Sequence, residues 1–371
     1  MQQDLNIKAL QKLFNNTNTS YKYLYFYSLI KIIKKNNLIK RISFKEILNE
    51  MLITMWLPCF QFNLNFRKQD YMKVFLIEFT KNSEKKIKEN KPTNKIIEKI
   101  KYEINSILNK KENYKKLKEQ ILEKYVLVRL IRPFYKRLIN KSESGIRGID
   151  KIGIKVLKND YKRENPPYLI NFEKSEIILN RKWSRYIKNH FSFLELWVLD
   201  EWHKYMQHQN VNSPNLYEKL KFPLFKRNSL DKQRNFWKKI ISKHKIKCIF
   251  TKQILTGNNF EIDHFICWNF LNHDQEWNLI PVLDEINGIK NNRIPQEKII
   301  KDFIDLKIKS FSYARSILSP KEHNKYLAEH SNFIDFSYDQ CFTSTFKSKY
   351  TKEINSLANK AKNQGFKTFV N

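Results

Sequence analysis

Cysteine is rare in this sequence, and so are the patterns in which cysteine has a structural role. The chain of 371 residues has 4 cysteines, and no two of them form a C-x-x-C pair. A disulfide framework or a zinc ribbon requires such closely spaced pairs, so the sequence indicates neither. We expect buried free thiols at Cys59, Cys248, Cys267 and Cys341.

Long apolar runs are also lacking. The most apolar stretch, residues 47–62, contains Glu50 and Pro58 and is shorter than the roughly 20 apolar residues that a membrane-spanning helix needs. The first residues show no basic segment followed by an apolar run and a cleavage site of small residues. We therefore expect no secretory signal, no transmembrane helix, no membrane partner and a cytoplasmic location.

Acidic residues are few relative to basic ones. The chain has 37 Asp and Glu against 70 Lys and Arg, which gives a formal net charge of +33. Such an excess favours a polyanionic partner, because each neutralised phosphate releases counterions. The codons of an AT-rich genome are an alternative source of the lysines, and the count of only 6 glycines fits that alternative. Nucleic acid is nevertheless the leading candidate partner.

The N-terminal part of the chain has the periodicity of helices. Apolar residues recur at three- and four-residue spacing from residue 5 to about residue 137. Residues 81–124 alternate charged and apolar positions as an amphipathic helix does, and a solvated face is favoured there over a DNA-binding face. Glycines and the pair Pro166-Pro167 mark turns between residues 141 and 167. We therefore place a domain boundary in that region.

Residues 182–209 are rich in aromatic side chains. Their helical spacing favours packing in a core, although aromatic residues interleaved with Arg and Lys also suit stacking on unpaired bases. His203 and His208 are five residues apart and so lie on different faces of a helix. Surface histidines are therefore favoured over a metal site in this stretch.

The segment 248–295 is the most informative part of the chain. Residues 260–265 alternate apolar and polar side chains as a half-buried strand does, and residues 278–283 form a second short run of β-favouring residues. A polar loop of about a dozen residues joins them. Asp284 is a suitable N-cap for a helix that must end before Pro295. The predicted unit is strand, loop, strand, helix.

This unit brings together side chains that suit metal-assisted hydrolysis. Asp263 and His264 are adjacent on a strand and point to opposite faces, but both can reach a cleft at the strand end. A helix packed across the hairpin would bring Asn287 toward Asp263 and offer two oxygen ligands to Mg²⁺ or Mn²⁺. An imidazole is partly unprotonated at neutral pH and can take a proton from water. Lys290 shares the helix face of Asn287 and could contact a phosphate.

Three short motifs stand out in the segment: Ile262-Asp263-His264, Trp277-Asn278-Leu279-Ile280-Pro281 and Asn287-x-x-Lys290-x-x-x-x-Pro295. With these motifs the segment resembles the HNH, or ββα-metal, nucleases. The spacing from His264 to Asn278 to Asn287 is similar to that in the HNH domain of the RNA-guided nuclease Cas9.

The resemblance implies a role for each matched residue. Asp263 and Asn287 would bind the metal, His264 would activate water, and Asn278 would hold the long loop and with it the orientation of the histidine. Asn287 stands where the family name has a second histidine, a replacement that keeps a metal-binding oxygen. Many members also bracket this core with paired cysteines that bind zinc. Only Cys248 precedes the motif here, so we expect no structural zinc.

We therefore predict an α+β, dominantly helical fold in which a ββα-metal module is embedded between helical regions. The predicted parts are a helical N-terminal domain at residues 1–140, a mostly helical connecting region at 141–244, the module at 245–300 and a helical C-terminal extension at 301–371.

The function implied by the resemblance is hydrolysis of phosphodiester bonds by a metal-dependent endonuclease, with DNA as the favoured substrate. The alternative is a non-catalytic nucleic-acid-binding protein with a degenerate module. One module cuts one strand, so a double-strand break would need a homodimer or two events, and the N-terminal region could answer to an activating partner. Defence against foreign DNA is a role inferred by analogy. The predicted catalytic residues are His264, Asn278 and Lys290, and the predicted phosphate contacts are Lys290, Arg293, Arg181 and Arg185.

Overall fold

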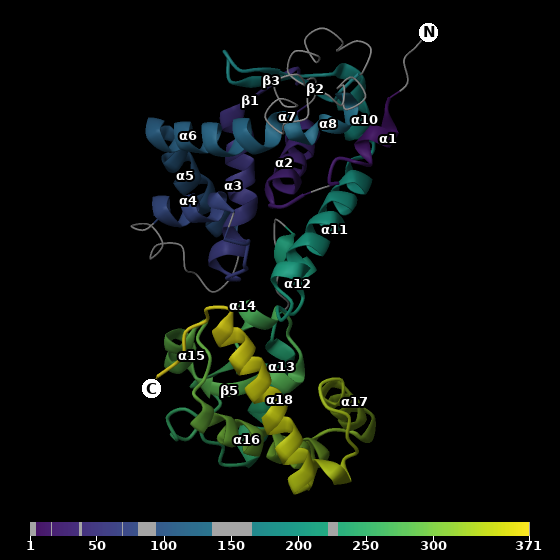
Figure 1. Cartoon of the computed structure of the whole chain (residues 1–371). Coiled ribbons are helices and arrows are strands. Elements are labelled where there is room, and N and C mark those ends of the chain that lie inside the picture. Colours follow the sequence, from purple (N-terminus) through teal and green to yellow (C-terminus); the bar gives the residue numbers. More distant parts are fainter. Residues whose placement is uncertain are drawn as a thin grey trace. The chain divides into compact units, whose positions relative to one another are not determined.

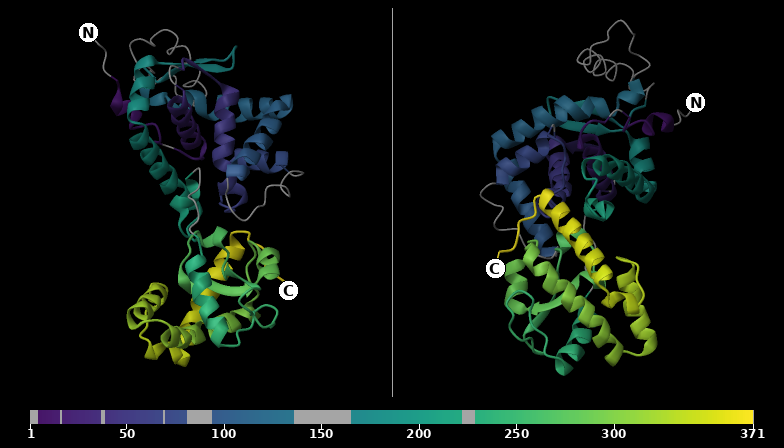
Figure 2. Two further views of the ribbon diagram at one scale, coloured as in Figure 1. Left: turned by 180° about the vertical axis from the view of Figure 1, so that it is seen from behind. Right: turned by 60° about the horizontal axis from the view of Figure 1, so that its bottom comes forward.

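The computed structural model describes residues 5–15, 17–36, 39–68, 70–80, 94–135, 165–221 and 229–370. This part of the chain is mostly helical with two small sheets, which confirms the predicted α+β, dominantly helical fold. It divides into two compact units (Figures 1 and 2). Unit 1 comprises Met1–Val211 and Leu216–Leu224, and unit 2 comprises Asn212–Asn215 and Phe225–Asn371. Among the described residues, no helix combines the length and apolarity needed to span a membrane.

Unit 1 is built around helix α2, which is buried on nearly every side and packs against α3 and α11. A helix that is apolar around most of its circumference belongs in the interior of a helical layer. The helices of unit 1 are α1 (Ile7–Leu10), α2 (Tyr21–Lys35), α3 (Phe44–Phe60), α4 (Tyr71–Thr80), α5 (Asn94–Asn109), α6 (Lys111–Leu117), the π-helix η2 (Lys118–Val126), α7 (Leu127–Leu130), α8 (Arg132–Tyr135), α10 (Arg181–Asn189), α11 (Phe191–Gln209) and α12 (Leu216–Leu220).

A small antiparallel sheet in unit 1 joins distant parts of the sequence. Its strands are β1 (Arg41–Ser43), β2 (Tyr168–Asn171) and β3 (Glu176–Leu179), in the order β1-β3-β2. Because β3 pairs with β1, residues 165–211 fold with the N-terminal helices rather than in a separate connecting region. The boundary between the two units therefore differs from the one predicted between residues 141 and 167. Residues 141–164 of that region lie outside the described residues. Residues 81–93 of the predicted amphipathic stretch also lie outside them.

The aromatic stretch at 182–209 contributes mainly to the core, as its spacing predicts. Trp183 and Trp202 are fully buried, and Trp183 Nε1 donates a hydrogen bond to Asn165 O at 2.7 Å. Phe193 is the exception, with 76% of its surface exposed. Most of the aromatic side chains in this stretch are thus occupied in packing.

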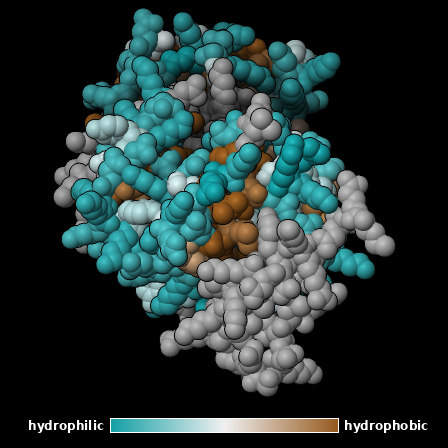
Figure 3. Space-filling view, turned by 90° about the horizontal axis from the view of Figure 1, so that it is seen from above, coloured by the Kyte–Doolittle hydropathy of each residue, from teal (hydrophilic) through white to brown (hydrophobic). Residues whose placement is uncertain are grey.

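Hydrophilic side chains cover much of the face drawn in Figure 3, with an apolar area exposed near its centre. Helix α10 shows how the basic residues are placed: Trp183 and Ile187 are buried, whereas Arg181 and Arg185 are exposed. Because the apolar side of this helix packs inward, its arginines face solvent.

Asp70 makes the stability of unit 1 dependent on pH. The residue is fully buried, and its Oδ2 accepts a hydrogen bond from Ser20 N at 3.3 Å. Burial is the largest cause that raises the pKa of Asp70, to about 7 from its usual 3.8. The folded chain therefore binds a proton more tightly than the unfolded chain, and stability falls as the pH rises from about 4 to about 7.

Replacing Asp70 by asparagine removes this ionisation. We expect Asp70→Asn to unfold at a higher urea concentration than the wild type above pH 7, and to lose that advantage near pH 4. The gain is limited to a few kcal/mol, since one unit of pKa corresponds to about 1.4 kcal/mol. Urea unfolding at a series of pH values measures it. If the urea midpoints of the two proteins changed with pH in the same way, Asp70 would not be the source of the pH dependence.

Unit 2 contains the predicted strand, loop, strand and helix. Strands β4 (Phe260–His264) and β5 (Leu279–Leu283) pair antiparallel, with Phe260 opposite Leu283 and His264 opposite Leu279. The connecting loop contains two short helical turns, α14 (Trp268–Leu271) and η5 (Glu276–Asn278). The other helices are α13 (Asp231–Lys243), α15 (Asp284–Lys290), α16 (Glu297–Ile317), α17 (Pro320–Ser331), η6 (Asp339–Phe342) and α18 (Ser344–Asn363).

The core of unit 2 is shared between the hairpin and the C-terminal helices. The ring of Phe265, just after β4, stacks on Phe303 of α16 with ring centroids 3.9 Å apart. Trp277 stacks in the same way on Phe333, which follows α17. The C-terminal extension is therefore part of one core with the ββα module. Cys59, Cys248, Cys267 and Cys341 are buried and free, as predicted.

Candidate active site

The end of strand β4 carries the two residues on which the predicted chemistry depends. Asp263 and His264 are opposite Ile280 and Leu279 of β5, and both are largely buried, with 6% and 7% of their surfaces exposed. Successive strand residues point to opposite faces. The two side chains accordingly have different partners, although they leave the backbone at the same end of the hairpin.

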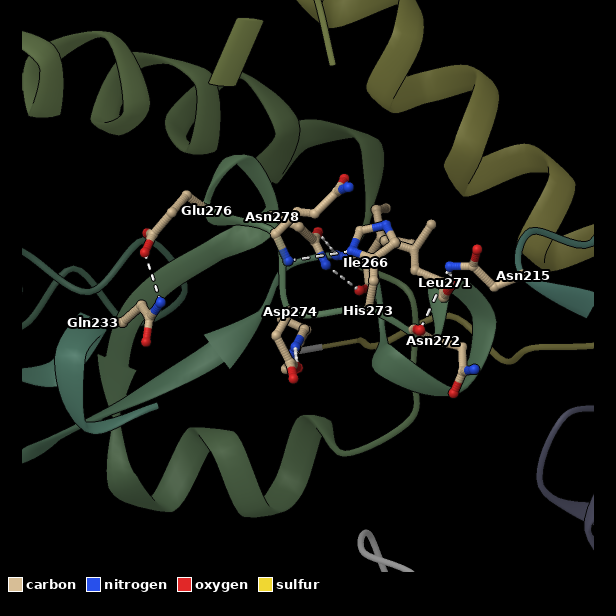
Figure 4. A network of polar contacts seen from close by, with 11 residues as sticks. Asn215, Gln233, Ile266, Leu271, Asn272, His273, Asp274, Glu276 and Asn278 are labelled. Atoms are coloured by element: carbon tan, nitrogen blue, oxygen red, sulfur yellow. Dashed lines mark hydrogen bonds and ion pairs between the residues drawn. The ribbon is translucent and has the colours of Figure 1, made fainter. Parts of the chain in front are cut away.

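His264 is held by an aspartate from the loop between the strands. Its Nε2 lies 2.9 Å from Asp274 Oδ1. A carboxylate that bonds one ring nitrogen selects the tautomer and fixes the direction of the imidazole. Asp274 was not among the residues predicted from the sequence, because one polar residue in a polar loop gives no periodic signal. It is labelled in Figure 4 beside the turn that leads into β5.

Lys290 faces inward, toward the aspartate. Its Nζ lies 2.8 Å from Asp263 Oδ2 and donates a hydrogen bond to His264 O at 2.7 Å. The side chain of Lys290 has no exposed surface. The i, i+3 spacing on α15 predicted that Lys290 would contact a phosphate, but in this structure its ammonium contacts the carboxylate and the backbone of β4.

Asn278 ties the start of the loop to its end. Its Nδ2 donates to Ile266 O and its Oδ1 accepts from Ile266 N, both at 2.8 Å (Figure 4). Asn278 O also accepts a hydrogen bond from Phe265 N at 2.8 Å. These bonds hold the two residues that directly follow His264. They are the contacts that the predicted positioning role of Asn278 requires.

Asp263 and Asn287 carry side-chain oxygens of the kind that bind a divalent cation. Within the described part of the chain, Asp263 Oδ2 accepts no hydrogen bond of good geometry, although Lys290 Nζ lies beside it. Asn287 is half-buried on α15, which packs against both strands. The described residues contain no group of three or more His, Cys, Asp or Glu that could hold a metal. Two protein oxygens suit Mg²⁺ or Mn²⁺, which retain several waters.

The arginines predicted to contact phosphates lie in different places. Arg293 is exposed just after α15, and its guanidinium donates a hydrogen bond to Ile289 O at 3.1 Å. Arg181 and Arg185 are exposed on α10, which belongs to unit 1, whereas the ββα residues belong to unit 2. Among these arginines, Arg293 is therefore the one that shares a unit with His264.

Comparison with known proteins finds a family match, and it covers the segment that contains the ββα unit. Residues 246–296 match the family described as HNH endonuclease. The matched range contains β4, β5 and α15, and with them Asp263, His264, Asn278 and Asn287. No curated protein and no solved structure matches the chain. The match to residues 246–296, which form the ββα unit, supports an HNH family for this segment.

Proposed function

We propose that the chain is an endonuclease that hydrolyses phosphodiester bonds of DNA and depends on a divalent metal ion. The observation that carries the proposal is the His264–Asp274 pair at the end of β4, inside a segment that matches the HNH endonuclease family. The net charge of +33 agrees with a polyanionic substrate. A cytoplasmic role in defence against foreign DNA follows from analogy alone.

Each side chain of the site has a separate role in the proposed hydrolysis. His264 takes a proton from the attacking water, while Asp274 keeps its ring in one orientation. Asp263 and Asn287 would hold Mg²⁺ or Mn²⁺, which supplies positive charge to stabilise the phosphate oxygens during the displacement. Asn278 fixes the chain on the far side of His264 through its two bonds to Ile266.

Asp274→Asn tests the orienting role of the carboxylate. The amide keeps the shape of the side chain but can present an NH₂ group to His264 Nε2, which favours the wrong tautomer or a turned ring. We expect the rate of cleavage at saturating DNA to fall between about 10-fold and 100-fold, with DNA affinity unchanged. Single-turnover kinetics measures the rate. A variant that cleaves at the wild-type rate would remove Asp274 from the mechanism.

The proposed function is tested by measuring cutting and binding separately. Labelled duplex DNA is incubated with the full chain in Mg²⁺, in Mn²⁺ and in EDTA, and binding is followed by mobility shift in EDTA. We expect cleavage only with metal. Tight binding in EDTA without cleavage in any metal would instead support the alternative, a nucleic-acid-binding protein with a degenerate module. Single-stranded DNA and RNA in the same assay define the substrate class.

The number of DNA strands cut in one event indicates whether the protein acts as a monomer or as a homodimer. One ββα module with one histidine breaks one strand, so a monomer yields nicked plasmid before linear plasmid. Linear product without a nicked intermediate would indicate a homodimer that cuts both strands together.

A further inference from the structure

Side chains from outside the family match bind the turn that leads into β5. Lys307 Nζ, on α16, donates hydrogen bonds to Glu276 O and Leu279 O, each at 2.5 Å. Tyr350 Oη, on α18, donates to Trp277 O at 3.1 Å. Lys307 has no exposed surface and Tyr350 has 2%. Three backbone carbonyls of one turn are thus held by the C-terminal helices.

Those carbonyls surround Asn278, the residue that holds the loop after His264. Asn278 follows Trp277 and precedes Leu279, so a shift of the turn would move its amide. That amide bonds both backbone groups of Ile266. Lys307 and Tyr350 are therefore linked, through the backbone of the turn and the hydrogen bonds of Asn278, to the residues that directly follow the catalytic histidine.

Helix α16 also supports the other side of the same loop. Phe303 stacks on Phe265, the residue after His264, with the two ring planes 11° apart. Phe303 and Lys307 are four residues apart and so lie on one face of α16. One face of this helix thereby contacts both the exit from β4 and the entry to β5.

Burying the ammonium group of Lys307 costs free energy unless hydrogen bonds or opposite charges compensate for it. Burial lowers the pKa of Lys307, and burial raises the pKa of the neighbouring Glu276, whose carboxylate accepts a hydrogen bond from Gln233 at 2.7 Å (Figure 4). His330 of α17 is also buried nearby, and Lys307 adds to the effect of burial in lowering its pKa. A methionine would fill the space without desolvating a charge. What lysine adds over methionine is its pair of bonds to the turn and a positive charge near the buried carboxylate of Glu276.

We propose that Lys307 and Tyr350 are positioning residues for His264, which they orient through the turn at Glu276–Asn278. The C-terminal helices then form part of the nuclease apparatus, although they lie outside the segment that defines the family. This inference rests on the proposed function, because the orientation of His264 matters to cleavage only if His264 is the base.

The test compares Tyr350→Phe and Lys307→Met with the wild type and with Lys309→Met, an exposed lysine on the same helix. Tyr350→Phe removes one hydroxyl and keeps the buried ring, so it remains informative if Lys307→Met does not fold. The measurements are kcat, KM, DNA affinity, the melting temperature, and the ¹⁵N spectrum of the histidine side chains, in which His264 is assigned by its loss in His264→Ala.

We expect kcat to fall by about 10-fold or more in both variants, with KM and DNA affinity within about twofold of the wild type, because small displacements of a catalytic group reduce rate more than binding. The His264 signals should shift, and Lys309→Met should behave as the wild type. Folded variants with wild-type kcat and unchanged His264 signals would overturn the inference. If the wild type cuts no DNA, the proposed function fails, and the His264 signals alone decide whether the C-terminal helices orient the ring.

Discussion

His264→Ala is expected to reduce the rate of DNA cleavage by about 10²-fold to 10⁴-fold, the range that a positioned general base contributes. The side chain lies at the end of β4, bonded to Asp274 and largely buried. DNA affinity should change little, because binding depends on the basic surface and not on this ring.

The rate is measured in a single turnover with enzyme in excess, which separates chemistry from product release. His208→Ala is the matched control, since His208 is an exposed histidine on α11 in unit 1. It should cleave as the wild type does. If His264→Ala retained more than about a tenth of the wild-type rate while binding DNA normally, another group would have to be the base.

Lys290→Met is expected to have the largest effect on the stability of unit 2. Lys290 is fully buried and lies 2.8 Å from a carboxylate that is itself only 8% exposed. Removing one member of such a pair leaves the other charge buried without a partner and costs about 3–5 kcal/mol. The loss should appear in metal-free buffer as a lower midpoint of urea unfolding.

Metal should restore part of that stability. A divalent cation bound at Asp263 replaces the positive charge of the lysine, and any ligand that binds only the folded chain stabilises it. We expect Mn²⁺ to raise the unfolding midpoint of Lys290→Met more than that of the wild type, while Lys309→Met responds as the wild type does. Equal responses in all three proteins would show that the ion pair and the metal do not share Asp263.

The hairpin and its helix could be predicted because their signals are local. Strand predictions at 260–265 and 278–283 correspond to β4 and β5, since alternation and β-favouring residues are written into the segments themselves. The helix ends before Pro295, as expected, but Leu283 is its N-cap and Asp284, the predicted N-cap, is its first helical residue. The three-stranded sheet of unit 1 could not be predicted in the same way. Its strands have three or four residues, and β1 pairs with β3 across more than a hundred positions.

The direction in which a side chain points was harder to predict than the helix on which it lies. Spacing correctly put Lys290 and Asn287 on one helix, but a long side chain can turn either toward solvent or toward a buried carboxylate, and spacing does not decide between them. Lys307 posed the same difficulty: within an amphipathic sequence it resembles a surface lysine. Helix α16 ends at Ile317, and Pro320 occupies the first turn of α17, where proline is favoured behind the capping residue Ser319.

The contact between His264 and Asp274 could not be predicted from the sequence for a further reason. The two residues are ten apart, and they meet only because α14, η5 and the bonds of Asn278 fold the loop back on itself. Helices α16 and α18, which lie after the motif, contact the turn at the end of this loop. A short motif identifies which residues belong to the site, but the whole of unit 2 determines how they meet.

The most direct test of His264 as the base is chemical rescue of His264→Ala by imidazole in the presence of Mg²⁺. The side chain that was removed is supplied again as a small molecule, and only the lost proton transfer can respond to it. We predict that the variant cuts plasmid very slowly, that its rate rises with imidazole concentration, and that EDTA abolishes cutting by both proteins. A His264→Ala protein that cuts as fast as the wild type without imidazole would contradict the account.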